Sequence, residues 1–133
     1  MTDRRTSALL LVVLATAACG SDSSTAPTTT TASSPTTLTW STLLAPAGTA
    51  SRLFSSSQAG TVTVTLTAAP VPLGFGVGVP RSGTLGCRLS VSTVDTAGAT
   101  MSVPVEQGDY CVEVFDEGRL SAQAGFTVTV AYP

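Results

Sequence analysis

The sequence contains no histidine and no lysine, and only 11% of its 133 residues are charged. Without an imidazole, a Ser-His-Asp triad, Cys-His catalysis and a His-ligated zinc site are all excluded within this chain. The formal net charge of −2 also lacks the basic footprint of a nucleic-acid-binding protein. We therefore expect a binding or structural protein with no catalytic residue, no cofactor and no nucleic-acid partner.

The first 18 residues have the pattern of a bacterial export signal. Arg4 and Arg5 precede an apolar run over residues 8–18, which is shorter than the roughly 20 apolar residues of a transmembrane helix. The run ends in Thr16-Ala17-Ala18-Cys19, which resembles the lipobox of bacterial lipoproteins. The resemblance implies that Cys19 carries a lipid and anchors the mature protein to a membrane outside the cytoplasm, in the periplasm or at the cell surface. The alternative is an ordinary secreted protein with a cysteine near its cleavage site.

Residues 19–37 contain little that could pack into a core. Positions 21–37 are mostly Ser and Thr, with Pro27 and Pro35 and no apolar residue larger than Ala. Such a composition cannot offset the entropy of ordering the chain. We expect a disordered tether that reaches roughly 50 Å from the anchor when extended.

From residue 38 to residue 133 apolar and polar residues alternate, which is typical of strands with one dry and one wet face. The alternation is clearest at 61–67, 110–114 and 126–130. Weaker candidates, separated in several places by turn-forming clusters, are 38–44, 49–54, 73–79, 85–92 and 99–105. The sequence predicts an all-β fold, a single antiparallel β-sandwich of about eight strands.

Two cysteines, Cys87 and Cys111, remain if the third carries the lipid, and in an oxidising compartment we expect them to form a disulfide. The bond would stabilise the fold by roughly 3 kcal/mol. Cys87 alternates in phase with residues expected to face inward (Leu85, Leu89 and Val91), whereas Cys111 is out of phase with inward-facing Val112. We therefore expect Cys87 at a strand end, an edge or a bulge. The alternative is two free thiols that are buried or bind a metal, although two cysteines are too few for a structural zinc site.

The carboxy-terminal half resembles the closing strands of the bacterial pre-peptidase C-terminal domain. Gly108, Tyr110, Val112 and Val114 match the family's "G-x-Y-x-V-x-V" strand, and residues 126–130 match its final "Y-T-L-T-V" strand with Phe in place of Tyr. The resemblance implies a jelly-roll-like sandwich of the kind usually attached to secreted peptidases, with calcium or matrix binding in some members. Residues 73–79 replace the aspartate-bearing strand expected in that family. We expect a stand-alone lipoprotein version of the domain.

The segment 73–79 alternates apolar residues with Gly74, Gly76 and Gly78. A strip of glycines in a strand marks close approach by a backbone or a ligand. One interpretation is a shallow ligand face, shared with Trp40, on which a glycan or an extended peptide lies. The other is that a neighbouring aromatic side chain, such as that of Trp40, covers the glycines.

The acidic residues Asp109, Glu113, Asp116 and Glu117 offer the oxygen ligands that calcium prefers. Their spacing lacks the dense alternation of a calcium loop, so we expect solvated turn residues, with Asp116 and Glu117 capping a hairpin, and no metal site. The resulting prediction is a lipid-anchored cell-envelope protein whose non-catalytic sandwich binds a glycan or an extended peptide. The alternative is a passive accessory module that packs on another envelope protein.

Overall fold

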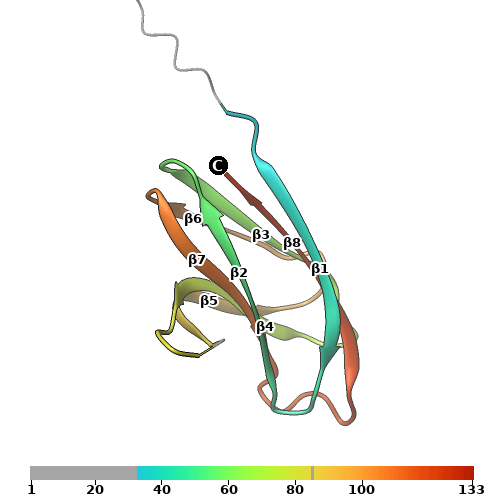
Figure 1. The fold of residues 1–133 in the computed structure, drawn as a ribbon. Coiled ribbons are helices and arrows are strands. Elements are labelled where there is room, and N and C mark those ends of the chain that lie inside the picture. Colours follow the sequence, from blue (N-terminus) through green and yellow to red (C-terminus); the bar gives the residue numbers. More distant parts are fainter. Residues whose placement is uncertain (1–32, 85) are drawn as a thin grey trace, which may run out of the picture. The chain divides into compact units, whose positions relative to one another are not determined.

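The computed structural model describes residues 33–84 and 86–133, which form two antiparallel sheets (Figure 1). The eight strands are β1 (Thr36–Leu44), β2 (Thr49–Ser56), β3 (Gly60–Ala68), β4 (Leu73–Pro80), β5 (Cys87–Asp95), β6 (Thr100–Val105), β7 (Gly108–Phe115) and β8 (Ala124–Tyr132). Within these described residues, no helix is long and apolar enough to cross a membrane. The predicted signal peptide (1–18), Cys19 and the predicted tether up to residue 32 lie outside the described residues.

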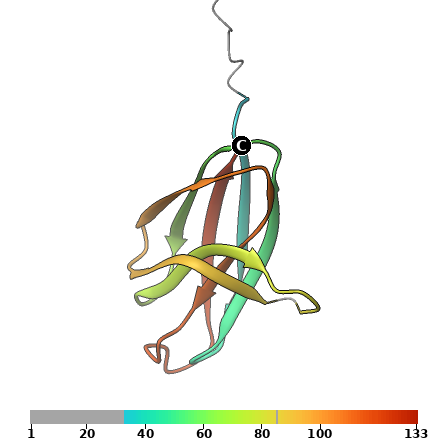
Figure 2. The same ribbon diagram turned by 90° about the vertical axis from the view of Figure 1, so that its left-hand side faces the viewer.

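The strand order is that of a jelly roll. Strands β1-β8-β3-β6 form one sheet, called sheet I below, and β2-β7-β4-β5 form the other, sheet II. Every connection except that between β4 and β5 passes from one sheet to the other. Figure 2 shows the same strands turned by 90° about the vertical axis. The prediction of an antiparallel β-sandwich of about eight strands is confirmed. The first strand begins at Thr36, two residues before the expected start of the domain at 38.

The core forms between the inward-facing apolar residues of the two sheets. Inward-facing residues of β3 and β8 are completely or almost completely buried, as the alternation predicted: Val62, Val64, Leu66, Phe126, Val128 and Val130. Sheet II contributes Phe75, Val77, Val112 and Val114 to the same cluster. Burying each such side chain stabilises the fold by about 1.5–3 kcal/mol before entropy is counted.

The predicted disulfide between Cys87 and Cys111 is present, with the two Cα atoms 5.8 Å apart. Cys87 is the first residue of the edge strand β5, and β5 carries a bulge where its register with β4 shifts. The expectation of a strand end, edge or bulge is therefore confirmed. Cys111 lies opposite Gly78 of β4, so the bond reaches from β7 past β4 to β5 on the outer face of sheet II.

The expectation that Leu89 faces the core is wrong, whereas Val91 lies on the inner face of sheet II as expected. The bulge places Leu89 opposite Gly78, on the outer face of sheet II, and Val91 opposite Val77. Because β5 is an edge strand, Val91 remains 45% exposed. Leu85, the third residue of this expectation, lies outside the described residues.

Candidate binding face

The glycine strip of β4 does not form an open ligand face. Gly74, Gly76 and Gly78 are all buried. A Cβ atom added to Gly74 would lie 2.1 Å from Cε2 of Phe115, so the ring of Phe115 occupies the space over this glycine. The interpretation that an aromatic side chain covers the glycines is therefore right for Gly74, but the aromatic residue is Phe115 and not Trp40.

The other two glycines are covered by the backbone of β5. A Cβ atom at Gly76 would lie 2.3 Å from the carbonyl oxygen of Val91, and one at Gly78 would lie 2.0 Å from that of Arg88. Backbone atoms cannot move aside as the end of a flexible side chain can. The glycines are therefore required for the close approach of β5 to β4, which also brings Cys87 to Cys111.

Trp40 lies in the other sheet, so the structure does not bring it together with the glycines. It is half-buried in β1, and its ring meets the ring of Phe126 edge-on, with centroids 5.1 Å apart and planes at 88°. This geometry is a favourable aromatic contact. The proposed grouping of Trp40 with Gly74, Gly76 and Gly78 is wrong, because the glycines lie on the outer face of sheet II whereas Trp40 packs toward the core from sheet I.

Asp116 joins two loops at one end of the sandwich. Its carboxylate accepts hydrogen bonds from the backbone N–H groups of Ala47 (2.9 Å), Arg119 (2.8 Å) and Leu120 (3.2 Å). Burial would raise the pKa of Asp116, but these backbone donors outweigh it and hold the pKa below its ordinary value. The expected capping role of Asp116 is thus confirmed, but the expectation that Asp116 is solvated is wrong, because it is only 6% exposed.

The other acidic residues do not converge, and the expectation that Asp109 and Glu113 lie in turns is wrong, because both belong to strand β7. Asp109 accepts a 2.6 Å hydrogen bond from the hydroxyl of Ser55 on the neighbouring strand β2. In the part of the chain that the structure describes, no three histidine, cysteine or acidic side chains lie close enough to hold a metal ion.

The outer face of sheet I is covered with hydroxyl groups. One row crosses all four strands, with a threonine on each: Thr39, Thr129, Thr65 and Thr100. Neighbouring hydroxyls on this face bond to one another, including Thr65 to Thr100 (3.1 Å) and Thr67 to Thr129 (3.2 Å). The four strands of sheet I contain no charged residue. The face is therefore polar, neutral and regular.

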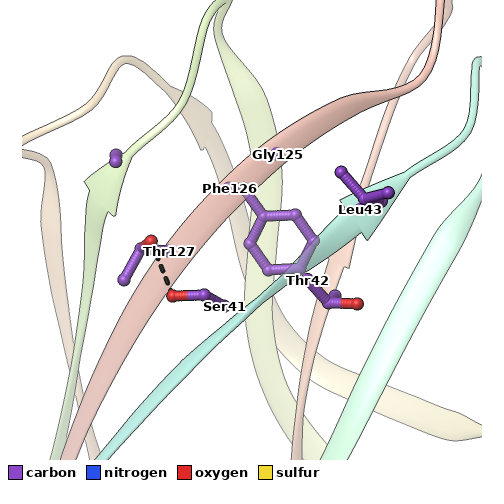
Figure 3. Close-up of a pocket in the computed structure, with 7 residues that line it drawn as sticks. Ser41, Thr42, Leu43, Gly125, Phe126 and Thr127 are labelled. Carbon is purple, nitrogen blue, oxygen red and sulfur yellow. Dashed lines mark hydrogen bonds between the residues drawn. The ribbon is translucent and has the colours of Figure 1, made fainter.

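A shallow hollow of about 340 Å³ lies at one end of sheet I (Figure 3). It is lined by residues of β1, β3 and β8: Ser41, Thr42, Leu43, Ala68, Gly125, Phe126 and Thr127. At its edge the hydroxyls of Ser41 and Thr127 form a 2.8 Å hydrogen bond, drawn as a dashed line in Figure 3. The hollow thus joins apolar surface to hydroxyl groups, and none of its lining residues is charged.

Gly125 leaves this hollow open although the fold does not need a glycine there. Its φ angle is not positive, and a Cβ atom added to it would make only an ordinary contact of 3.9 Å with Cδ2 of Leu43. Leu43 itself is 60% exposed. An unneeded glycine in a strand costs about 0.5–1 kcal/mol relative to alanine. The open space beside Leu43 is therefore kept at some cost to stability.

Sequence reasoning missed this hollow. One signal was available: Leu43 and Leu44 are adjacent in a strand, so one of them had to face outward. Gly125 gave no such signal, because Leu43, which pairs with it, and Ala68, which lines the same hollow, come from distant parts of the sequence.

No model of a known protein family matches the sequence, and no curated protein matches it. The fold is similar to that of a Yersinia pseudotuberculosis-derived mitogen, with a TM-score of 0.55 and 7% identity over 74% of this chain and 87% of the mitogen chain. It is also similar to PliG of Aeromonas hydrophila, a periplasmic inhibitor of g-type lysozyme. Here the TM-score is 0.52 and the identity 16%, over 73% of this chain and 84% of PliG. At these identities the similarity establishes the fold alone.

Proposed function

We propose that this protein is a non-catalytic binding module of the cell envelope, held by a lipid on Cys19, which binds a neutral glycan in the hollow of sheet I. The lipid anchor rests on the lipobox-like residues before Cys19. A location outside the cytoplasm is supported by the disulfide, a bond that persists in oxidising compartments.

The observation that carries the proposal is the open space at Gly125. A glycine that no backbone angle and no close neighbour requires weakens the strand, yet it keeps Leu43 and the hollow accessible. A ligand that fills this space would recover the contacts that the empty hollow lacks.

The lining of the hollow suits a sugar ring. The C–H surface of a pyranose can pack on Leu43 and Ala68, while the hydroxyls of Ser41 and Thr127 can donate and accept hydrogen bonds. The absence of charged residues from the lining favours a neutral sugar over an anionic one.

The hollow lies far from the end of the domain that the lipid anchor would hold, so a ligand could reach it without meeting the membrane. Residues 33–35 lead into β1 at Thr36, and Leu43 lies near the opposite end of this strand. At about 3.3 Å per residue, the hollow is roughly 20 Å from the point where the tether would join the domain.

The test is titration of the purified protein with a panel of neutral oligosaccharides. Trp40 is the only tryptophan, and its ring touches Phe126, which lines the hollow, so its fluorescence reports occupancy without a label. We expect a saturable change in the wild type and its loss in Gly125→Leu, in which the new side chain fills the hollow. Leu43→Ala should weaken binding because it removes one apolar wall.

The matched control is Leu53→Ala. Leu53 is a similarly exposed leucine, 53% against 60% for Leu43, but it lies in β2 of sheet II. We expect Leu53→Ala to bind as the wild type does. A folded wild type that responds to no oligosaccharide, or a response that Gly125→Leu leaves unchanged, would contradict the proposal.

A further inference from the structure

The sandwich has four edge strands, and three of them carry features that discourage pairing with another chain. In sheet II, β2 carries Arg52, and β5 carries a bulge, Arg88 and the disulfide. In sheet I, β6 is only six residues long and contains Pro104. Charges, bulges, prolines and short length are the usual means by which natural sheets protect their edges.

The fourth edge, β1, has none of these features. It is nine residues long, contains no charge and no proline, and pairs with β8 in one continuous register from Thr36 to Leu44. In an antiparallel pair, alternate residues point their N–H and C=O groups away from the partner strand. Within residues 33–84 and 86–133, no backbone hydrogen bond outside the strand ladders involves residues 36–44. The outer side of β1 therefore presents a row of backbone donors and acceptors.

The side chains of β1 indicate what kind of strand could pair with this edge. Leu38 and Trp40 belong to the inward-facing set and pack against the core, but they are only half-buried. An added strand would cover them if it carried apolar residues on its inner face. On the outer face it would lie beside the hydroxyl groups of Thr39 and Ser41. Because β1 is uncharged, an uncharged strand matches it best.

We infer that β1 is a strand-addition site for an uncharged, extended segment of a partner protein, in which β-branched apolar residues alternate with Thr or Ser. Main-chain hydrogen bonds supply the affinity of such complexes, and the alternating side chains supply the selectivity. A second copy of this chain fits less well. Antiparallel pairing of two β1 strands would place the two Thr36 residues at opposite ends of the pair. This does not suit two molecules held in one membrane, a step that rests on the lipid anchor proposed above.

The experiment is titration of the purified protein with a synthetic peptide of nine alternating Thr and Val residues, flanked by lysines for solubility. A peptide of the same composition, with all Thr residues before all Val residues, is the control ligand. We expect the alternating peptide alone to change the fluorescence of Trp40 and to protect the amides of residues 36–44 from hydrogen exchange. Gly125→Leu should not affect this binding, so its result is independent of the proposed glycan site.

Thr39→Lys and Thr100→Lys form the matched pair of variants. Both residues are exposed and lie in the same threonine row, but on opposite edges of sheet I. A second alternating peptide, with lysine at the position facing residue 39, should bind Thr39→Lys about twofold to fivefold more weakly than Thr100→Lys, because like charges on neighbouring strands repel. Thermal unfolding confirms that both variants fold.

Three results would overturn the inference. The first is a folded wild type that does not bind the alternating peptide. The second is equal weakening by Thr39→Lys and Thr100→Lys. The third is a wild type that dimerises in solution through residues 36–44, which would assign the edge to a second copy of the chain.

Discussion

The two sheets of the sandwich share a core but differ in charge and in how their outer faces are covered. Sheet II carries all the charged residues found in the eight described strands, which are Arg52, Arg88, Asp95, Asp109 and Glu113. Its outer face is also closed by the chain itself, because Phe115 and the backbone of β5 cover the glycines of β4. Sheet I has an outer face of hydroxyl groups that no other described element covers, with a hollow at one end.

This difference shows that a glycine in a strand can have either of two structural causes. Gly78 is required, because the backbone of β5 occupies the place of its side chain. Gly125 is not required by any neighbour or by its backbone angle. Glycines that are required indicate internal packing, and a glycine that is not required indicates accessible space. We therefore place the candidate binding site in sheet I.

The largest expected effect is that of Gly78→Val. The new side chain would meet the carbonyl of Arg88, so β5 would have to move away from β4 and strain the disulfide. We expect a loss of about 3 kcal/mol or more in the free energy of unfolding, or failure to fold. Urea denaturation measures this. The control is Gly125→Ala, which should raise stability by about 0.5–1 kcal/mol. Equal effects of the two substitutions would remove the distinction between the two kinds of glycine.

The disulfide comes second. Replacing both Cys87 and Cys111 with alanine should lower the free energy of unfolding by about 3 kcal/mol, because the bond closes a loop across a sequence separation of 24 residues. The edge strand β5 should show the greatest increase in amide hydrogen exchange, and sheet I the smallest. If amide hydrogen exchange increases equally in both sheets, β5 does not unfold separately from the rest of the domain, and this prediction is wrong.

A smaller effect is expected at Asp116. Because its pKa in the folded protein lies below the ordinary value of 3.8, its ionised form stabilises the fold above that pH. This contribution is lost as the pH falls below 3.8 through the lower, folded-state pKa. Thermal unfolding between pH 2 and pH 6 should show that the Tm of the wild type falls at the acidic end. The Tm of Asp116→Asn should fall less steeply over the same range. Parallel curves for the two proteins would contradict this role of Asp116.

The fold was largely predictable because its signals are local. The alternation in β3 and β8 predicts both the strands and the faces that they bury, and Val62, Val64 and Val128 are buried as expected. The disulfide was predictable from the count of cysteines and the expected compartment. The alternation in this segment misled for Leu89 but not for Val91, because it contains no sign of the bulge between them, which depends on the pairing of β5 with β4. The role of Cys19 stays a prediction.

The sequence by itself determined that this domain is built of strands that each bury one face, because its apolar residues recur with a period of two. Only the tertiary structure decided which surfaces are covered and which are open. Gly74 and Gly125 look alike in the sequence, but the first lies under the ring of Phe115 and the second beside an exposed leucine. The physical reason is that cover comes from residues far apart in the chain, brought together by the strand order of the two sheets.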